Sequence, residues 1–227
     1  MSGELQNKVM RFFGQREASA RVLRPLKRLY RVTYRTPWPY VPDRLDFAVM
    51  LNRRGVVGRA VEVGVQEGKF SETLLDGWTG EHLTSIDPWK AAPVEEYVDV
   101  SNVSQEQHDA YYEETQRRLA RFGGRSTIWR MSGDEAADRV EARSLDLAYI
   151  DARHDYAAVI QDLETWIGKV RPGGIFAGHD YLDGMVEGSD FGVKSAVRQF
   201  FGQRGIRVNA TFADPPYLTW FVVMPGR

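Results

Sequence analysis

Short apolar runs alternate with helix-like segments along most of the chain. Five runs rich in apolar and β-branched residues predict buried strands, at Arg59–Val63, Leu83–Ile86, Thr127–Met131, Leu145–Ile150 and Gly174–Ala177. Between the last two runs, apolar side chains recur at a spacing close to that of a helix, at Val159, Ile160, Leu163, Trp166, Ile167 and Val170. Strands that alternate with helices predict a doubly wound α/β fold with a mostly parallel sheet.

The other elements follow from similar patterns and from the positions of glycine and proline. Helices are expected at Phe47–Arg54, from Phe70 onward, up to Phe122, at Asp134–Ala142 and at Val193–Phe201. Two last strands, Ile206–Thr211 and Leu218–Val223, are separated by a proline turn and predict an antiparallel hairpin at the sheet edge, which brings the sheet to seven strands. The glycine- and acid-rich segment Asp183–Phe191 is expected to be a loop.

Residues 1–35 differ from the rest of the chain in charge. They carry nine Lys and Arg against two Glu, whereas the remaining residues carry 21 basic and 29 acidic side chains. Such a segment can meet nucleic acid or an anionic membrane surface. Apolar residues at helical spacing instead favour a helix packed on an acidic body or on a second subunit, at Val22, Leu23, Leu26, Leu29 and Tyr30. We therefore expect no nucleic-acid partner, and the apolar face leaves a homodimer open.

Three prolines in TPWPYVP, residues 36–42, predict a rigid connector after the basic helix. The predicted organisation is a basic helical extension with its connector over residues 1–45, followed by one α/β domain over residues 46–227. Within this domain, the polar stretch at about residues 90–112 is expected to be a lid that closes over a site.

The composition is that of an ordinary globular protein, with 43% apolar and 27% charged residues. The chain has no cysteine, which excludes a disulfide framework and a thiolate metal site. The sequence shows neither an apolar leader nor a run of roughly 18 apolar residues that could span a membrane. A cytoplasmic protein without a membrane span is therefore expected.

Polar side chains follow two of the predicted strands. Asp151 and His154 come after Leu145–Ile150, and His179 and Asp180 come after Gly174–Ala177. A strand, a helix and a strand of this size form a right-handed crossover between parallel strands. The two pairs are therefore expected at the same edge of the sheet, where ligands bind in open α/β folds.

The turn after the first strand reads EVGVQEG, from Glu62 to Gly68. It lacks the G-x-G-x-x-G pattern of dinucleotide sites, although Gly64 and Gly68 still permit a sharp turn and a close ligand. The carboxylates of Glu62 and Glu67 would repel a pyrophosphate and suit a cationic ligand such as S-adenosylmethionine. Asp87 at the end of the second strand can accept both hydroxyls of a ribose, or can form an Asp-Pro turn.

With these features the chain resembles the class I S-adenosylmethionine-dependent methyltransferases. The matching blocks, within about residues 55–225, are AVEVGVQEGKFS, SIDPW, MSGDEAA, LDLAYIDARHDY, and RPGGIFAGHDY with the later GVKSAV. The chain is most similar to small metal-dependent O-methyltransferases of sugar hydroxyls, including the macrolide-sugar enzymes and those of mycobacterial methylmannose polysaccharides. The resemblance implies a seven-stranded Rossmann-like methyltransferase fold, S-adenosylmethionine as cofactor, and a small-molecule or oligosaccharide acceptor such as a mannoside.

The resemblance also implies roles for individual residues. The cofactor would be bound by Glu62, Gly64, Val65, Gly68, Ser71, Asp87, Ser132, Gly133, Asp134 and Asp151. A divalent cation would be held by Asp151, His179 and Asp180, with His179 standing where the family often has a carboxylate. Carboxylate ligands suit Mg²⁺, whereas a His ligand favours Mn²⁺ or another transition metal. His154 matches the base that removes the proton of the acceptor hydroxyl.

Two other functions fit the sequence. A catechol-type methyltransferase would place two phenolic oxygens on the metal and stack the acceptor ring on Trp38, Tyr40 or Trp89. A non-enzymatic protein would keep the fold and bind nucleic acid through the basic segment. Activity on catechols but not on sugars would favour the first alternative, and RNA binding without cofactor binding would favour the second.

Overall fold

A computed structural model describes residues 41–93, 98–99, 101–186, 188–213 and 215–226 of the chain. The chain divides into two compact units, Met1–Trp38 and Pro39–Arg227, and all described residues belong to the second unit. The predicted basic helix, its apolar face and the connector aromatics Trp38 and Tyr40 lie outside the described residues.

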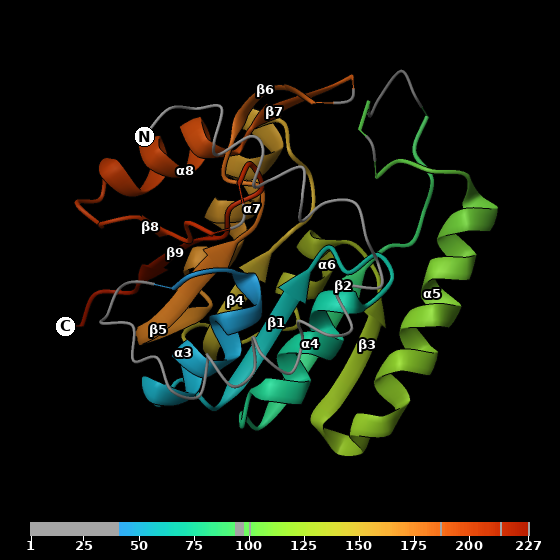
Figure 1. The fold of residues 1–227 in the computed structure, drawn as a ribbon, viewed down its shortest axis with the longest axis horizontal. Helices are drawn as coiled ribbons and strands as arrows, with labels where there is room; N and C mark the ends of the chain where they lie inside the picture. The colour runs from blue at the N-terminus through green and yellow to red at the C-terminus, as the bar shows by residue number, and fades with distance from the viewer. Residues whose placement is uncertain (1–40, 94–97, 100, 187, 214, 227) are drawn as a thin grey trace, which may run out of the picture. The chain divides into compact units, whose positions relative to one another are not determined.

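The second unit is built on a seven-stranded sheet with the strand order β3-β2-β1-β4-β5-β9-β8 (Figure 1). Five neighbouring strands are parallel, namely β3 (Ser126–Arg130), β2 (His82–Asp87), β1 (Arg59–Val63), β4 (Leu145–Ile150) and β5 (Val170–Gly178). The sheet then ends in two antiparallel strands, β9 (Trp220–Val223) and β8 (Asn209–Ala210). This confirms the predicted α/β sheet with its antiparallel edge hairpin.

Helices cover both faces of the sheet. One face packs against α3 (Phe47–Arg53), α4 (Lys69–Gly77) and the end of α5 (Gln105–Leu119). The other face packs against α6 (Gly133–Ala137), α7 (Tyr156–Ile167) and α8 (Val193–Gly202). Two 3₁₀ helices, η1 (Arg44–Asp46) and η2 (Ala120–Arg125), precede α3 and β3. Because the central strands are covered on both sides, they are nearly continuous apolar runs, which is what made them predictable.

The helices of the described residues give no candidate for a membrane span, since none is both long and apolar enough.

The prediction was wrong at two places beyond α7. Val170, expected on the helix, begins β5, and strand pairing then shifts because the chain bulges before Ile175. Gly173 permits this bulge with a φ of 76°. The segment expected to be a loop forms a separate antiparallel hairpin of β6 (Asp183–Val186) and β7 (Ser189–Gly192). These strands are four residues long, which is too short for a clear apolar alternation.

Helix α5 also begins earlier than expected, at Gln105, inside the stretch predicted to be a lid. Ser104 caps the helix, because its Oγ accepts the backbone N–H of Gln107 at 3.2 Å. A lid in this part of the chain is therefore confined to residues before Ser104.

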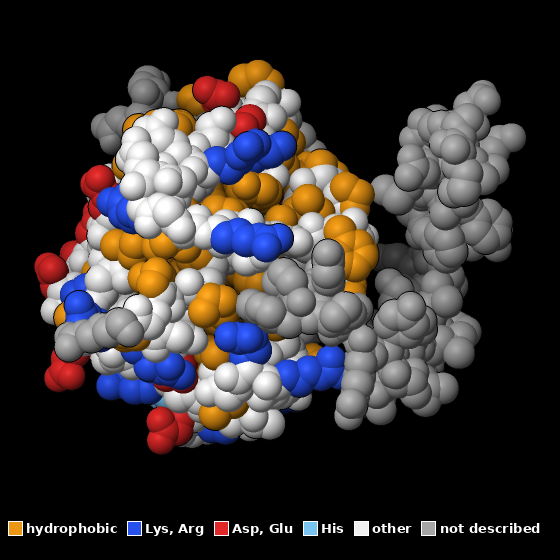
Figure 2. All heavy atoms as spheres, turned by 90° about the vertical axis from the view of Figure 1, so that its left-hand side faces the viewer, with side chains coloured by type: hydrophobic (Ala, Val, Ile, Leu, Met, Phe, Trp, Pro, Cys, Tyr) orange, Lys and Arg blue, Asp and Glu red, His pale blue; other side chains and the backbone are white. Residues whose placement is uncertain are grey.

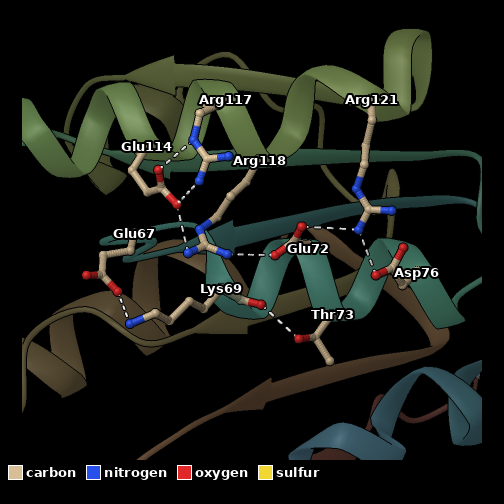
Figure 3. A network of polar contacts seen from close by, with 9 residues as sticks. All are labelled: Glu67, Lys69, Glu72, Thr73, Asp76, Glu114, Arg117, Arg118 and Arg121. Carbon is tan, nitrogen blue, oxygen red and sulfur yellow. Dashed lines mark hydrogen bonds and ion pairs between the residues drawn. The ribbon is translucent and has the colours of Figure 1, made fainter. Parts of the chain in front are cut away.

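Ion pairs fasten α5 to α4 (Figure 3). Arg118 of α5 contacts Glu72 of α4 at 2.8 Å and Glu114 of its own helix at 2.7 Å. Arg121 contacts the same Glu72 at 3.1 Å and Asp76 at 2.8 Å. Because Glu72 and Glu114 both bind Arg118, the five side chains form one connected network, which we call the α4–α5 clasp.

The clasp holds α5 against the turn that joins β1 to α4. Thr115 of α5 is fully buried, and its Oγ1 donates a hydrogen bond to the carbonyl oxygen of Gln66 at 2.9 Å. A Cβ on Gly68 would lie 3.1 Å from the methyl group of Thr115. Helix α5 therefore packs against the glycine turn and helps to hold it in place.

Candidate active site

A cavity of about 730 Å³ opens at the edge of the sheet where the parallel strands end. The ends of all five parallel strands contribute to its lining, through Gly64, Asp87, Ser132, Asp151 and His179. The predicted site residues that line the cavity are Glu62, Gly64, Val65, Asp87, Ser132, Gly133, Asp134, Asp151, His154, His179 and Asp180. Of the described residues that were predicted to form the site, Gly68 and Ser71 alone do not line the cavity.

The first turn needs its two glycines. Gly64 and Gly68 have φ angles of 85° and 72°, in the left-handed region that favours glycine. A Cβ on Gly64 would lie 2.0 Å from the carbonyl oxygen of Asp151, so the ends of β1 and β4 leave no room for a side chain. Gly68 precedes the first residue of α4 and shapes the turn without lining the cavity.

Glu62 is a buried carboxyl group on β1, with 1% of its surface exposed. Burial raises its pKa to about 8, although the hydrogen bond that it accepts from the Ser71 hydroxyl favours the ionised form. Ser71 in turn contacts the hydroxyl of Ser85 at 2.8 Å. The structure therefore places Ser71 as a support for Glu62.

Asp87 ties the end of β2 to the glycine turn. Its Oδ2 accepts the backbone N–H groups of Val65 at 2.9 Å and Gln66 at 3.0 Å, and its Oδ1 accepts that of Trp89 at 2.7 Å. Three such bonds fix the carboxylate in the lining of the cavity. Asp87 thus stabilises the turn and also faces the cavity, where it can contact a ligand.

Residues Ser132–Asp134 form the wall of the cavity after β3. Ser132 caps α6, because its Oγ accepts the N–H of Glu135 while the Glu135 carboxylate accepts the N–H of Ser132. The Asp134 carboxylate accepts bonds from Gln161 at 2.7 Å and Thr165 at 3.3 Å. Both partners lie on α7, so Asp134 holds α6 against α7.

His154 lies between two carboxylates. Its Nδ1 is 2.7 Å from Asp99 Oδ2, its Nε2 is 3.0 Å from Asp180 Oδ2, and its ring stacks on Phe191 at a centroid distance of 4.3 Å. Burial opposes the charged imidazolium, but the hydrogen bonds and charges of Asp180 and Asp99 outweigh burial and raise the pKa of His154 to about 10. In this arrangement the imidazole is protonated at neutral pH.

Asp180 in turn lies between two histidines, His154 and His179. Burial works against its charge, but hydrogen bonds with His154 and His179 hold the pKa of the Asp180 carboxyl well below its usual range. His179 Nδ1 lies 3.0 Å from Asp180 Oδ1 and 3.9 Å from Asp151 Oδ1. Its Nε2 is buried and has no hydrogen-bond partner among the described residues.

Three residues of this region fit a divalent cation. One ligand atom each from Asp151, His154 and Asp180 lies within 4.8 Å of the others. Asp99 orients His154 through Nδ1, which is the arrangement that carboxylates give to metal-binding histidines. Two carboxylates and one imidazole suit Mn²⁺ or a similar metal better than an all-oxygen set does. His179 borders this group without belonging to it.

Arg44 reaches the same site from η1. Its Nη2 donates to Asp151 Oδ2 at 2.8 Å, its Nη1 lies 3.4 Å from His179 Nδ1, and its guanidinium sits 4.3 Å from the Phe70 ring centroid. Burial opposes its charge, but the neighbouring Tyr149 and Asp151 raise the pKa of Arg44 above its ordinary value. Arg44 therefore balances part of the negative charge beside the acidic residues.

Sequence reasoning missed Arg44 and Asp99. Arg44 follows the proline connector and was counted with the extension, and Asp99 is one of many acids in the polar stretch. Neither residue lies at the end of a strand, so neither had a local signal. The only clue to Asp99 was its place in the predicted lid, from which an acid could reach His154.

The chain belongs to a family of methyltransferase domains. The family model, described as a methyltransferase domain, matches residues 61–181, which run from β1 to just beyond β5 and contain most of the cavity wall. The chain therefore contains a methyltransferase domain, by family and by fold.

A curated relative and several solved structures share parts of the chain. An uncharacterized protein, y4gI, from Sinorhizobium fredii is 28% identical over 131 residues, which are 54% of this chain and 13% of that protein. The chain thus spans only a small part of that relative. A Corynebacterium glutamicum protein of known structure matches with a TM-score of 0.57 and 15% identity, over 99% of both chains.

Two solved O-methyltransferases have the same fold. The enzyme from Bacillus cereus, in complex with SAH, matches with a TM-score of 0.55 and 13% identity over 97% of both chains. The O-methyltransferase TomG from Streptomyces achromogenes, involved in tomaymycin synthesis and in complex with SAM, matches with a TM-score of 0.55 and 14% identity. That match covers 81% of this chain and 79% of TomG.

Proposed function

We propose that the protein transfers a methyl group from S-adenosylmethionine to a saccharide hydroxyl, with the help of a divalent cation. The observation that carries this proposal is the cavity itself. It joins the glycine turn and Asp87 at one end to Asp151, His154 and Asp180 at the other. A cofactor site and a deprotonation site in one cavity are what an O-methyl transfer requires.

The cofactor residues support S-adenosylmethionine over a dinucleotide. Asp87 is fixed where it can accept ribose hydroxyls, and Glu62 lines the turn side of the cavity, where a cationic donor would favour its ionised form. Glu67 lies on the same side and pairs with Lys69. Two solved enzymes of the same fold were crystallised with SAM or SAH, which supports the same ligand here.

The cation would be held by the carboxylates of Asp151 and Asp180, which leaves Nε2 of His154 to act on the proton. It would stabilise the alkoxide that develops as the acceptor hydroxyl loses its proton. Its charge would also be matched by three nearby carboxylates, of Asp99, Asp151 and Asp180. Arg44 donates to Oδ2 of Asp151, so a cation ligated by that oxygen would have to displace the guanidinium.

His154 is the proposed acceptor of the hydroxyl proton. Its Nδ1 is held by Asp99, so Nε2 is the nitrogen that faces the acidic residues and the cavity. The hydrogen bond from Nε2 to Asp180 must give way to the acceptor hydroxyl before the proton can move. Ligation of a cation by Asp180 would remove this hydrogen bond and place a positive charge beside the ring. Both changes lower the pKa of His154, so the imidazole would become neutral and able to accept the proton.

A saccharide fits the described lining better than a catechol does. Trp89, one of the aromatic residues that a catechol would stack on, is fully buried, with its indole N–H donated to the Gln66 carbonyl at 2.8 Å. The lining near the predicted lid includes Lys90, Ser101, Asn102 and His108, all of which are polar. Polar side chains of this kind can bind the hydroxyl groups of a sugar.

The nucleic-acid alternative finds no support on the face of the described residues that Figure 2 shows. The basic segment on which it rests lies outside the described residues. On the side near α8 and β8, the Lys and Arg side chains of the described residues lie among apolar side chains and do not merge into one stripe (Figure 2). Phosphate binding along a nucleic acid needs such a continuous basic surface.

The test is methyl transfer to a panel of mannosides, deoxysugars and catechols, with and without EDTA. We expect product from at least one sugar, loss of product with EDTA, and recovery with Mg²⁺ or Mn²⁺. Product from catechols alone would replace the saccharide acceptor with a catechol. Full activity in EDTA would rule out the cation. Binding of RNA with no binding of S-adenosylhomocysteine would remove the enzymatic proposal altogether.

A further inference from the structure

The β6–β7 hairpin holds His154 at its ring and at its backbone. The Phe191 ring of β7 lies nearly parallel to the imidazole, with 10° between the ring planes and 4.3 Å between the centroids. The next residue, Gly192, donates its backbone N–H to the carbonyl oxygen of His154 at 2.8 Å. Two successive residues of one strand therefore fix the proposed base.

Both ends of the hairpin are tied to helices (Figure 1). A Cβ on Gly192 would lie 2.7 Å from the Cβ of Tyr156, the first residue of α7, so only glycine fits at this contact. At the other end, the carboxylate of Asp183 accepts the backbone N–H and the hydroxyl of Ser195 on α8, each at 2.9 Å. Gly192 and Ser195 belong to the GVKSAV block, to which the sequence gave no role.

The contact on the ring face does what the two hydrogen bonds of the imidazole cannot do. The bond from Nδ1 to Asp99 holds one edge of the ring and leaves it able to tilt, because the χ2 torsion of histidine is broad. Ligation of the proposed cation by Asp180 would remove the second bond, at Nε2. The stack on Phe191 uses neither nitrogen, so it remains while Nε2 exchanges Asp180 for the acceptor hydroxyl.

We infer that Phe191 is a positioning residue, and that the β6–β7 hairpin holds its ring against His154 so that Nε2 points at the acceptor hydroxyl. The inference rests on the proposed function, in which His154 takes the proton of that hydroxyl. Phe191 is 3% exposed and does not line the cavity, so it acts through the imidazole and not on a ligand. A tilted base loses rate because proton transfer needs hydrogen-bond geometry.

Steady-state kinetics with the best acceptor of the panel separate positioning from packing. Phe191→Leu keeps an apolar side chain without the flat face, and we expect kcat to fall roughly tenfold to a hundredfold while the acceptor KM stays within about twofold. Phe191→Tyr keeps the face and should retain most of kcat. The matched control is Phe200→Leu, because Phe200 is also 3% exposed but packs its ring on Arg204 and Phe201. It should leave kcat nearly unchanged.

Two substitutions on the surface of the hairpin leave the core intact. Asp183→Ala removes both bonds to Ser195, and we expect a severalfold lower kcat with unchanged affinity for S-adenosylhomocysteine. Asp190→Ala, at an exposed position of β7, should change neither quantity.

Every outcome decides the inference. Unchanged kcat in a folded Phe191→Leu protein overturns it, and so does the same loss in Phe191→Tyr or in Phe200→Leu. If Phe191→Leu does not fold, equal kcat in Asp183→Ala and Asp190→Ala overturns it. These results leave the proposed function in place, because the unaltered protein is active in each. An unaltered protein that methylates no acceptor removes the proposed function, and the inference falls with it.

Discussion

Arg44 and Asp151 form an ion pair of 2.8 Å although 107 positions separate them in sequence. Asp151 also belongs to the group of three residues that can hold a cation. If the proposed cation binds Asp151, Arg44 would compete with it for this carboxylate. Release of the ion pair would then be coupled to metal binding.

Replacement of Arg44 should strengthen metal binding and weaken the fold. We expect Arg44→Met to bind Mn²⁺ severalfold more tightly in calorimetry, because no guanidinium has to be displaced from Asp151. In EDTA the same variant should lose about 2 kcal/mol of unfolding free energy in urea titrations, since Asp151 is left unpaired. The exposed Arg53→Gln variant serves as the control, with both quantities unchanged. Weaker Mn²⁺ binding by Arg44→Met would show that Arg44 does not compete with the cation.

Glu62 should make the protein less stable as the pH rises. Its pKa is raised to about 8 in the folded protein, against about 4.5 for an ordinary Glu, so the folded state binds the proton more tightly. The stabilisation is complete below the ordinary pKa and declines between roughly pH 4.5 and pH 8. Urea titrations across this range should show a smaller decline for Glu62→Gln. Parallel curves for the two proteins would mean that Glu62 does not titrate in this window.

Substitution of Asp180 should weaken metal binding more than substitution of His179 does. We expect Asp180→Asn to weaken Mn²⁺ binding by more than roughly tenfold, because it removes a direct ligand. His179→Ala should weaken it by less, since His179 lies outside the group of three ligand atoms. Calorimetry with Mn²⁺ in the absence of cofactor measures both. A larger loss in His179→Ala than in Asp180→Asn would assign His179 as a ligand.

His154 should govern turnover and not cofactor affinity. We expect His154→Gln to lower the rate of methyl transfer by about 10²–10⁴-fold, which is the usual contribution of a positioned base. Its affinity for S-adenosylhomocysteine should stay within about twofold, because the imidazole faces Asp99 and Asp180 and not the glycine turn. Single-turnover rates and calorimetry separate the two effects. Wild-type turnover in this variant would remove the proposed base.

The sequence predicted the sheet and most of the polar residues at its edge. Buried parallel strands are short apolar runs, and the polar residues that follow them must lie at one edge, so Asp151, His154 and Asp180 were found together. Asp87 and the glycine turn were found for the same reason. This logic works wherever local sequence decides the position of a side chain.

The same logic fails where a contact is made between distant segments. Arg44 meets Asp151 from a 3₁₀ helix, and Asp99 meets His154 from the polar stretch, so neither pair leaves a pattern in the sequence. Phe191 looks like an ordinary apolar residue of a predicted loop, and only its stack on His154 sets it apart. Tertiary packing determines these features, and a periodic pattern does not record it.

The α4–α5 clasp allows a matched test of charge and burial. Arg118 contacts acids on both helices with its side chain 24% exposed, whereas Arg117 pairs with Glu114 on its own helix with its side chain 72% exposed. Removal of Arg118 leaves two acids without their shared cation, and an exposed pair is worth little. We expect Arg118→Ala to cost about 1–2 kcal/mol of unfolding free energy, whereas Arg117→Ala should leave the stability nearly unchanged.

Arg118→Ala should also weaken cofactor binding, although Arg118 lies outside the cavity lining. Helix α5 supports the glycine turn through Thr115, whose hydroxyl bonds to Gln66, so a looser α5 leaves the turn less ordered. We expect a severalfold loss of S-adenosylhomocysteine affinity in Arg118→Ala and none in Arg117→Ala. High salt should reduce the difference in stability between these variants, because it screens the partly exposed charges. Equal stability and equal affinity in the two variants would show that the clasp does not hold the turn in place.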